Sequence, residues 1–208
     1  MTTEREKMLR GELYVASDPE LVAARDRARR LWRSYNALDP ADVATRRTVL
    51  EQLLGAVGSG VVIEPPFFCD YGTQITIGAD VFVNFNCVFL DCSTITIGRQ
   101  TQIGPAVQLY TATHPVDPVA RTAGPELAHP IVIGSRVWIG GGSVPASGGR
   151  SMKSRPSSMS VNGAVSEQYT TDAPSTSTRY AIATHGWLSR AHVIFAAPMS
   201  KDAPSISS

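Results

Sequence analysis

The chain has 208 residues, with 19 basic and 18 acidic side chains and a formal net charge of +1. Its length suffices for one or two domains with a substantial core, and its near-neutral charge argues against nucleic acid as an electrostatically chosen partner. Because no run of about 18 apolar residues and no apolar signal segment occurs, we expect no membrane association and a cytoplasmic location.

The first segment, residues 1–57, is rich in charged side chains and carries leucine and aromatic residues at helical spacing. Asp18 before Pro19, and Asp39 before Pro40, are typical of a helix N-cap followed by proline at the first helical position. We therefore expect three helices, over about residues 3–15, 19–35 and 40–56.

The second of these helices carries a cluster of arginines that acidic residues flank, which favours a solvated face over a phosphate site. They are Arg25, Arg27, Arg29, Arg30 and Arg33.

From residue 75 the apolar pattern has a period of six. Eight hexads open on an aliphatic or aromatic residue: "IGADVF", "VNFNCV", "FLDCST", "IGRQTQ", "IGPAVQ", "LYTATH", "IGSRVW" and "IGGGSV". Glycine often comes second, and a small or β-branched residue tends to come fifth. A strand that turns a corner every six residues gives this pattern, with the first residue inward and three hexads closing one triangular coil. The sequence therefore predicts a mainly β protein, with a parallel β-helix over residues 58–144, in preference to a sandwich or barrel of short strands.

Three cysteines are an odd number in a chain without a secretion signal, so we expect no disulfide framework. Cys69, Cys87 and Cys92 are interpreted as small buried hydrophobic residues. Cys87 and Cys92 lack the close pairing and the nearby histidines of a tetrahedral zinc site, and we expect no metal.

The repeat breaks at "YTATHPVDPVAR", residues 110–121, where a lone histidine precedes a proline-rich stretch. A coil that ends at "LYTAT" places His114 at its rim, and residues 114–130 leave the coil as an extruded loop that walls a cleft. An imidazole titrates near neutral pH and can accept the proton of an alcohol nucleophile. The alternative is a structural histidine bonded to a backbone carbonyl at the loop edge.

Five sequence motifs accompany the repeat: "EKMLRGELY", "IEPPFFCDYG", "VNFNCVFLD", "YTATHPVDPVAR" and "VWIGGGS". Together, over about residues 4–144, they closely resemble the maltose and galactoside O-acetyltransferases of the hexapeptide-repeat superfamily. The resemblance implies a left-handed β-helix capped by the N-terminal helices, a homotrimer, and acetyl-CoA bound between neighbouring subunits. It also implies acetyl transfer to a hydroxyl of a maltose-like or glucose-like sugar, with His114 as general base. We expect Phe85 and Phe89 to anchor the trimer interface.

Three further residues match family positions near the reacting groups. Asn84 matches an asparagine that lines the acceptor site, and its alternative is a ladder of asparagines along the coils. Gly141 occupies the position whose amide N–H binds the oxyanion of the tetrahedral intermediate. Trp138 matches an aromatic residue beside the cofactor, or else only covers the side of the coil.

Three carboxylates match positions on the acceptor side. Asp70 and Glu126 fall where the family faces the acceptor, although either could equally be a solvated turn residue. Asp91 either orients His114 or binds substrate, and the residues alone leave both roles open.

After Val144 the resemblance stops. Residues 145–208 are rich in serine and show no six-residue phase, which predicts an irregular or disordered tail and points to a shifted reading frame or a retained intron. His185, Trp187 and His192 receive no functional role. If later coils are missing, part of the acetyl-CoA cleft is missing too, so the alternative function is a catalytically impaired trimeric assembly protein.

Overall fold

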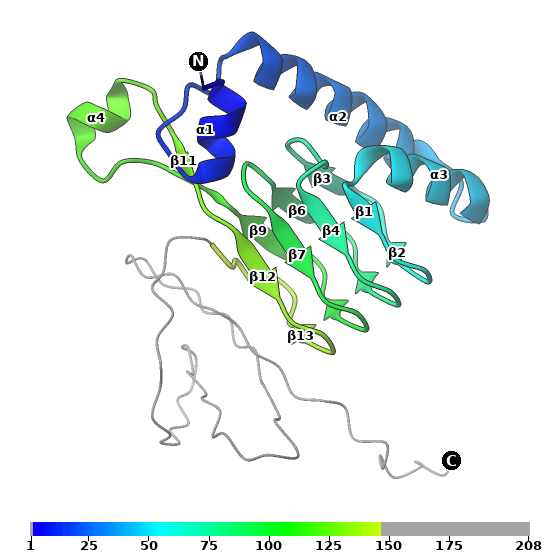
Figure 1. Cartoon of the computed structure of the whole chain (residues 1–208). Helices are drawn as coiled ribbons and strands as arrows, with labels where there is room; N and C mark the ends of the chain where they lie inside the picture. Colours follow the sequence, from blue (N-terminus) through cyan, green and yellow to red (C-terminus); the bar gives the residue numbers. More distant parts are fainter. Residues whose placement is uncertain (1, 147–208) are drawn as a thin grey trace, which may run out of the picture.

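The structure is a computed structural model that describes residues 2–146 (Figure 1). Predictions for residues 147–208, which include His185, Trp187 and His192, lie outside the described residues. No helix in the described part is both long and apolar enough to cross a membrane.

Three helices precede the β region: α1 (Glu4–Arg10), α2 (Pro19–Ala37) and α3 (Val43–Leu53). Helix α2 begins as predicted, because Pro19 is its first residue and the Asp18 carboxylate accepts the N–H of Glu20 at 2.9 Å. Helix α2 packs against β3 (Phe67–Cys69), and α3 packs against β1 (Ala56–Val57). The helices therefore cover the first turn of the β region (Figure 1).

Helices α1 and α3 are shorter than the sequence suggested. Helix α1 ends before Gly11, whose φ of 73° is a left-handed conformation that glycine favours and that terminates a helix. Helix α3 begins after Asp42, whose carboxylate accepts the N–H of Thr45 at 3.1 Å. Asp39 instead accepts the N–H of Ala41 at 2.8 Å, so it closes a turn ahead of the helix.

The β region winds through three parallel sheets, each of which forms one side of a coil. Side one contains β1, β4 (Ile75–Ile77), β7 (Ile95–Ile97) and β12 (Ile131–Ile133). Side two contains β2 (Val62–Ile63), β5 (Phe82–Val83), β8 (Gln102–Ile103) and β13 (Trp138–Ile139). Side three contains β3, β6 (Cys87–Leu90) and β9 (Gln108–Tyr110). The parallel coil that the hexads predict is therefore present.

The first residue of every hexad points into the coil. None of these eight side chains is more than 7% exposed: Ile77, Val83, Phe89, Ile97, Ile103, Leu109, Ile133 and Ile139. The expectation that Phe89 anchors an interface is therefore wrong, because Phe89 lies inside the coil, edge-on to Phe67. Phe85 is 53% exposed, as an interface residue must be. All three cysteines are free thiols in the interior, as predicted.

An inserted arm interrupts the coil. Ile75 pairs with Ile95 and Ile95 pairs with Ile131, so one step is 20 residues and the next is 36. The additional residues form an antiparallel pair, β10 (Ala112–Thr113) with β11 (Leu127–Ala128), and helix α4 (Pro118–Thr122). We call residues 112–128 the arm. It projects beside α1 (Figure 1) and corresponds to the extruded loop expected from the sequence.

Candidate functional site

The residues expected to form a site fall into two groups at the two edges of side three. At the edge where side three turns into side one lie Asp70, Asp91, His114 and Glu126, and we call it the arm edge. At the edge where side two turns into side three lie Asn84 and Gly141, with Trp138 on the neighbouring strand, and we call it the glycine edge.

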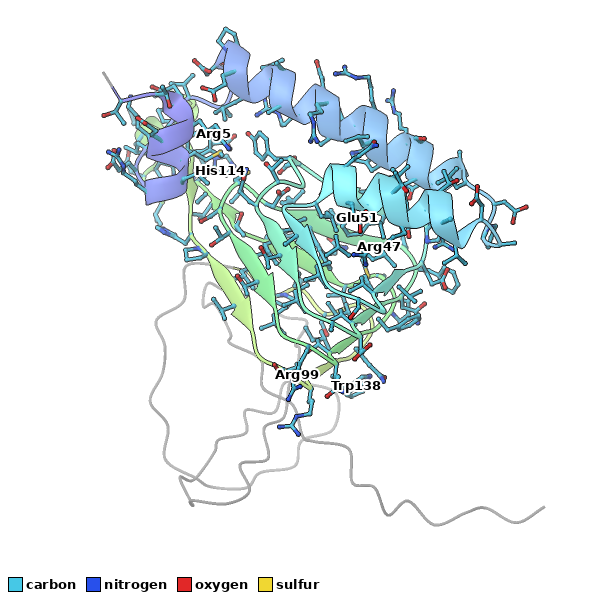
Figure 2. All side chains as sticks on the ribbon, turned by 45° about the vertical axis from the view of Figure 1, so that its right-hand side comes forward. Arg5, Arg47, Glu51, Arg99, His114 and Trp138 are labelled. Carbon is cyan, nitrogen blue, oxygen red and sulfur yellow. The ribbon has the colours of Figure 1, made fainter. Side chains whose placement is uncertain are left out.

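Strand β6 separates the two edges. Asn84 precedes this strand and Asp91 follows it, and its four residues alone span about 13 Å. Figure 2 shows His114 near α1 and Trp138 at the opposite end of the strands, where Arg99 is also labelled. A single chain therefore does not bring His114 together with Asn84, Trp138 or Gly141.

His114 follows β10 on the arm, and its side chain is exposed. The register pairs Ala112 with Ala128 and Thr113 with Leu127, so one further step places His114 opposite Glu126. Within residues 2–146 the imidazole makes no hydrogen bond, so the backbone carbonyl contact of a structural histidine is not present there. The geometry leaves the imidazole accessible to a ligand.

Asp91 is fully buried and binds backbone. Its Oδ1 accepts the N–H groups of Asp70 at 3.1 Å and Tyr71 at 2.8 Å, and its Oδ2 accepts that of Gln74 at 3.2 Å. Burial raises the pKa of Asp91 to about 7, and these hydrogen bonds oppose the rise. No bond joins Asp91 to His114 in the described part of the chain. With no exposed surface to offer a substrate, Asp91 instead holds the corner of the coil.

Asp70 lies beside this corner and is half-buried. Burial raises the pKa of its carboxyl group, while the nearby Arg25 guanidinium and a hydrogen bond from the Cys92 thiol, at 3.4 Å, lower it. Arg25 donates to the Tyr71 hydroxyl at 2.7 Å and to the Ala16 carbonyl at 2.6 Å. The expectation that all the α2 arginines are solvated is therefore wrong for Arg25.

Glu126 links the arm to the N-terminal segment. Its backbone exchanges two hydrogen bonds with Tyr14, at 3.1 and 3.0 Å, and its Oε2 accepts the Tyr14 hydroxyl at 2.9 Å. The sequence did not indicate Tyr14 or Arg25 as site residues. In the sequence, only their positions could have pointed to them: Tyr14 ends the motif "EKMLRGELY", and Arg25 belongs to the arginine cluster.

The glycine edge consists mainly of coil backbone. The side-chain oxygen Oδ1 of Asn84 accepts the backbone N–H of Phe85 at 2.8 Å, and the side-chain NH2 of Asn84 has no partner among residues 2–146. The strand register stacks Asn84 between Glu64 and Gly104, so a ladder of asparagines is not present.

Gly141 lies two coils along from Asn84, about 10 Å away along the coil axis. A Cβ at Gly141 would lie 3.0 Å from the Pro105 carbonyl oxygen, so the position has no room for a side chain without a shift. The Gly141 N–H donates to no acceptor in the described residues, and the residue is exposed. This edge therefore offers an accessible backbone donor.

Trp138 is 58% exposed and lies in register with Gln102, on the outer face of side two. Among residues 2–146, no group of three or more histidine, cysteine, aspartate or glutamate side chains could hold a metal ion.

Comparison with known proteins gives consistent matches. The family model described as "Maltose acetyltransferase hexapeptide capping motif" matches residues 7–58. Nodulation protein L of Rhizobium meliloti (strain 1021) is 51% identical over 142 residues, which cover 68% of this chain and 78% of that protein.

Two solved structures share the fold. A maltose O-acetyltransferase from Clostridium difficile 630 has 42% identity and a TM-score of 0.68, with 69% of this chain and 77% of the other covered. A hexapeptide-repeat acetyltransferase from Vibrio cholerae O1 biovar eltor, complexed with acetyl coenzyme A, has 41% identity and a TM-score of 0.64. That match covers 69% of this chain and 78% of the other.

Proposed function

Because this chain belongs to the maltose and galactoside O-acetyltransferase family of hexapeptide-repeat acetyltransferases, we propose that it transfers acetyl from acetyl-CoA to a sugar hydroxyl. The acceptor class we propose is a neutral sugar of the maltose or glucose kind. The observation that carries the proposal is the division of the site residues between two edges, one with an accessible imidazole and one with an accessible N–H.

The two edges supply complementary parts of an acyl transfer. His114 accepts the proton of the acceptor hydroxyl while its oxygen attacks the thioester carbonyl carbon. The Gly141 N–H donates to the carbonyl oxygen as it gains negative charge, and the Asn84 NH2 is a second neutral donor near the acceptor. When the carbon–sulfur bond breaks, the proton on His114 passes to the departing thiolate of CoA. We propose that Trp138 lies beside the bound CoA.

The remaining carboxylates belong to the acceptor side of this site. Asp70 and Glu126 lie at the arm edge, where they can accept hydrogen bonds from sugar hydroxyls. Asp91 supports them indirectly, because it holds the backbone N–H of Asp70. A pair of acidic side chains beside the imidazole favours a neutral acceptor over an anionic one.

The separation of the edges requires a second copy of the chain. A site that joins the arm edge of one copy to the glycine edge of the next uses two different surfaces, and such a head-to-tail contact closes into a ring. We propose that the ring is a homotrimer of left-handed coils, with the exposed Phe85 beside Asn84 as an interface anchor.

Mixing of subunits tests this arrangement. His114→Ala and Asn84→Ala should each abolish most CoA release, measured by thiol detection with maltose or glucose as acceptor. Copies dissociated and reassembled in equal amounts should recover about one quarter of the wild-type sites, because one site in four joins an intact His114 to an intact Asn84.

A pair of variants on the same edge is the matched control. His114→Ala mixed with Glu126→Ala should recover no activity beyond the average of the two variants alone, because each copy then carries a defect at its own arm edge. Recovery in the control, or none in the test mixture, would contradict a site shared between copies.

A catalytically impaired trimeric assembly protein is the second candidate. It is favoured by side three, where residues 2–146 form three strands and residues 143–146 only begin a fourth, through a bridge from Tyr110 to Ala146 and the N–H groups of Gln108 and Tyr110, which donate to the Ser143 and Pro145 carbonyls. A stable trimer that binds no acetyl-CoA by calorimetry would support this candidate against the enzyme.

A further inference from the structure

The N-terminal segment contacts the arm through α1, which packs against β11, and through Tyr14. Tyr14 forms an antiparallel bridge with Glu126, with both backbone hydrogen bonds present, and adds a third bond from its hydroxyl to Glu126 Oε2. The ring of Tyr14 is 1% exposed and packs with Met8, Leu21 and Ala128. The hydroxyl bond satisfies the buried phenol and also holds a charged side chain of the arm.

The hydroxyl bond fixes a carboxylate on the face of the arm that carries His114. Residues opposite each other in an antiparallel pair share a face, and every second residue along a strand returns to it. Ala112 and Ala128 form such a pair and pack in the cluster that contains Tyr14. His114 and Glu126 lie one residue beyond the ends of these strands, and continued alternation places them on that same face.

The chemistry of the phenol suits a permanent donor. Burial raises the pKa of Tyr14 far above its ordinary value, so the hydroxyl keeps its proton at every working pH. On Glu126, the Tyr14 hydroxyl donates to Oε2 alone, and Oε1 accepts no hydrogen bond within residues 2–146. One oxygen of the carboxylate is thus held, and the other remains available on the face shared with His114.

We infer that Tyr14 is a positioning residue of the acetyl-transfer site, whose hydroxyl orients Glu126 toward the acceptor beside His114. The inference rests on the proposed function and deepens it, because it assigns a task in transfer to the N-terminal segment. Without the hydroxyl, the Glu126 side chain samples several rotamers, and the acceptor meets a disordered carboxylate.

Tyr14→Phe tests the inference, because it removes only the oxygen and keeps the ring and the backbone bridge. We expect kcat/KM for the sugar acceptor to fall about tenfold, in line with the loss of a hydrogen bond to a charged group. KM for acetyl-CoA should stay within about twofold of wild type, because that ligand contacts the other edge. In a Glu126→Ala background the same change should have no further effect on kcat/KM.

Tyr35→Phe is the matched control. Tyr35 is also 1% exposed, and its hydroxyl donates to the Ile63 carbonyl and accepts from the Arg46 guanidinium at 3.1 Å, in the core beneath α2 and away from the arm edge. Both variants should lose thermal stability, while only Tyr14→Phe should change the kinetics with the acceptor. Trypsin cleavage after the exposed Arg121 should be equally slow in both, which shows that the arm stays anchored.

Three outcomes would overturn the inference. Tyr14→Phe could match Tyr35→Phe in all kinetic constants, which leaves Tyr14 a structural residue. Its effect could multiply with that of Glu126→Ala, so that Tyr14 does not act through the carboxylate. A wild-type chain that releases no CoA with any sugar would remove the proposed function itself, and this result is recognisable before any variant is made.

Discussion

The arm edge and the glycine edge are built in opposite ways. The arm edge is assembled from side chains of three segments, with bonds between residues as far apart as Tyr14 and Glu126. The glycine edge is successive corners of one coil, where Gly141 contributes a backbone N–H and the lack of a Cβ. Under the proposed function, the edge that moves a proton depends on tunable side chains. The edge that faces developing charge depends on rigid backbone.

The largest expected effect is a difference between the two edges in how much a substitution lowers the free energy of unfolding. Asp91→Ala leaves three N–H groups of the arm edge without an acceptor, two of them buried, and each buried group costs about 1–3 kcal/mol. We therefore expect the free energy of unfolding to fall by about 3 kcal/mol or more, measured by urea denaturation. Asn84→Ala at the glycine edge removes one bond to an exposed N–H and should cost less than about 1 kcal/mol. Equal losses at both edges would contradict the contrast.

The second effect separates activity from stability within the arm edge. Under the proposed function, His114→Ala removes the general base and should lower kcat by about 10²-fold. The melting temperature should not change, since the exposed imidazole makes no hydrogen bond within residues 2–146. Steady-state kinetics and thermal denaturation of the same preparation provide the check. Near-normal turnover, or a collapsed fold, would show that His114 is structural.

The third effect is a dependence of stability on pH that belongs to the arm edge. Asp91 is the one fully buried charged residue among those described. Its pKa is about 7 in the fold against an ordinary 3.8, so the folded chain binds this proton more tightly than the unfolded chain. The contribution of Asp91 is therefore complete below about pH 4 and is lost as the pH rises through about 7.

Urea denaturation between about pH 4 and 8 measures this dependence, with a slope from Asp91 of at most about 1.4 kcal/mol per pH unit. Asp91→Asn does not titrate and should remove the slope. If wild type and variant show the same pH dependence, another group is responsible and the assignment to Asp91 is wrong.

The sequence predicts the coil well because its signal is local. The first residue of each hexad points inward, and this rule correctly predicts the burial of Phe89, the first residue of "FLDCST". The expectation that Phe89 faces outward as an interface anchor contradicted this rule. Glycine-edge residues follow from the same repeat, since three hexads and the two residues between "FLDCST" and "IGRQTQ" make a step of 20 that carries Asn84 to Gly104. Helix ends were less accurate, because a left-handed Gly11 and a second capping aspartate, Asp42, compete with the propensity pattern.

The arm edge could be predicted only in part, because its contacts are distant in sequence. Arg25 reaches Tyr71 across 46 residues, and Tyr14 reaches Glu126 across 112. A sequence periodicity does not predict contacts between residues so far apart in the chain. The burial of Asp91 was equally hidden, since an aspartate at a coil corner looks like a solvated turn residue until the three N–H groups converge on it.

The arm is inserted where side three turns into side one, and this placement has a consequence for how proteins of this fold can vary. Ile95 pairs with Ile131 in the same way that Ile75 pairs with Ile95, so the coil resumes its register as though nothing intervened. The arm leaves at Thr111 and returns at His129, whose N–H binds the Thr111 carbonyl at 2.9 Å. Since the ends of the inserted segment touch, doubling its length costs only about 0.6 kcal/mol in closure entropy. Under the proposed function, the residues of the arm that face the acceptor can therefore be exchanged as a unit while the scaffold keeps its dimensions.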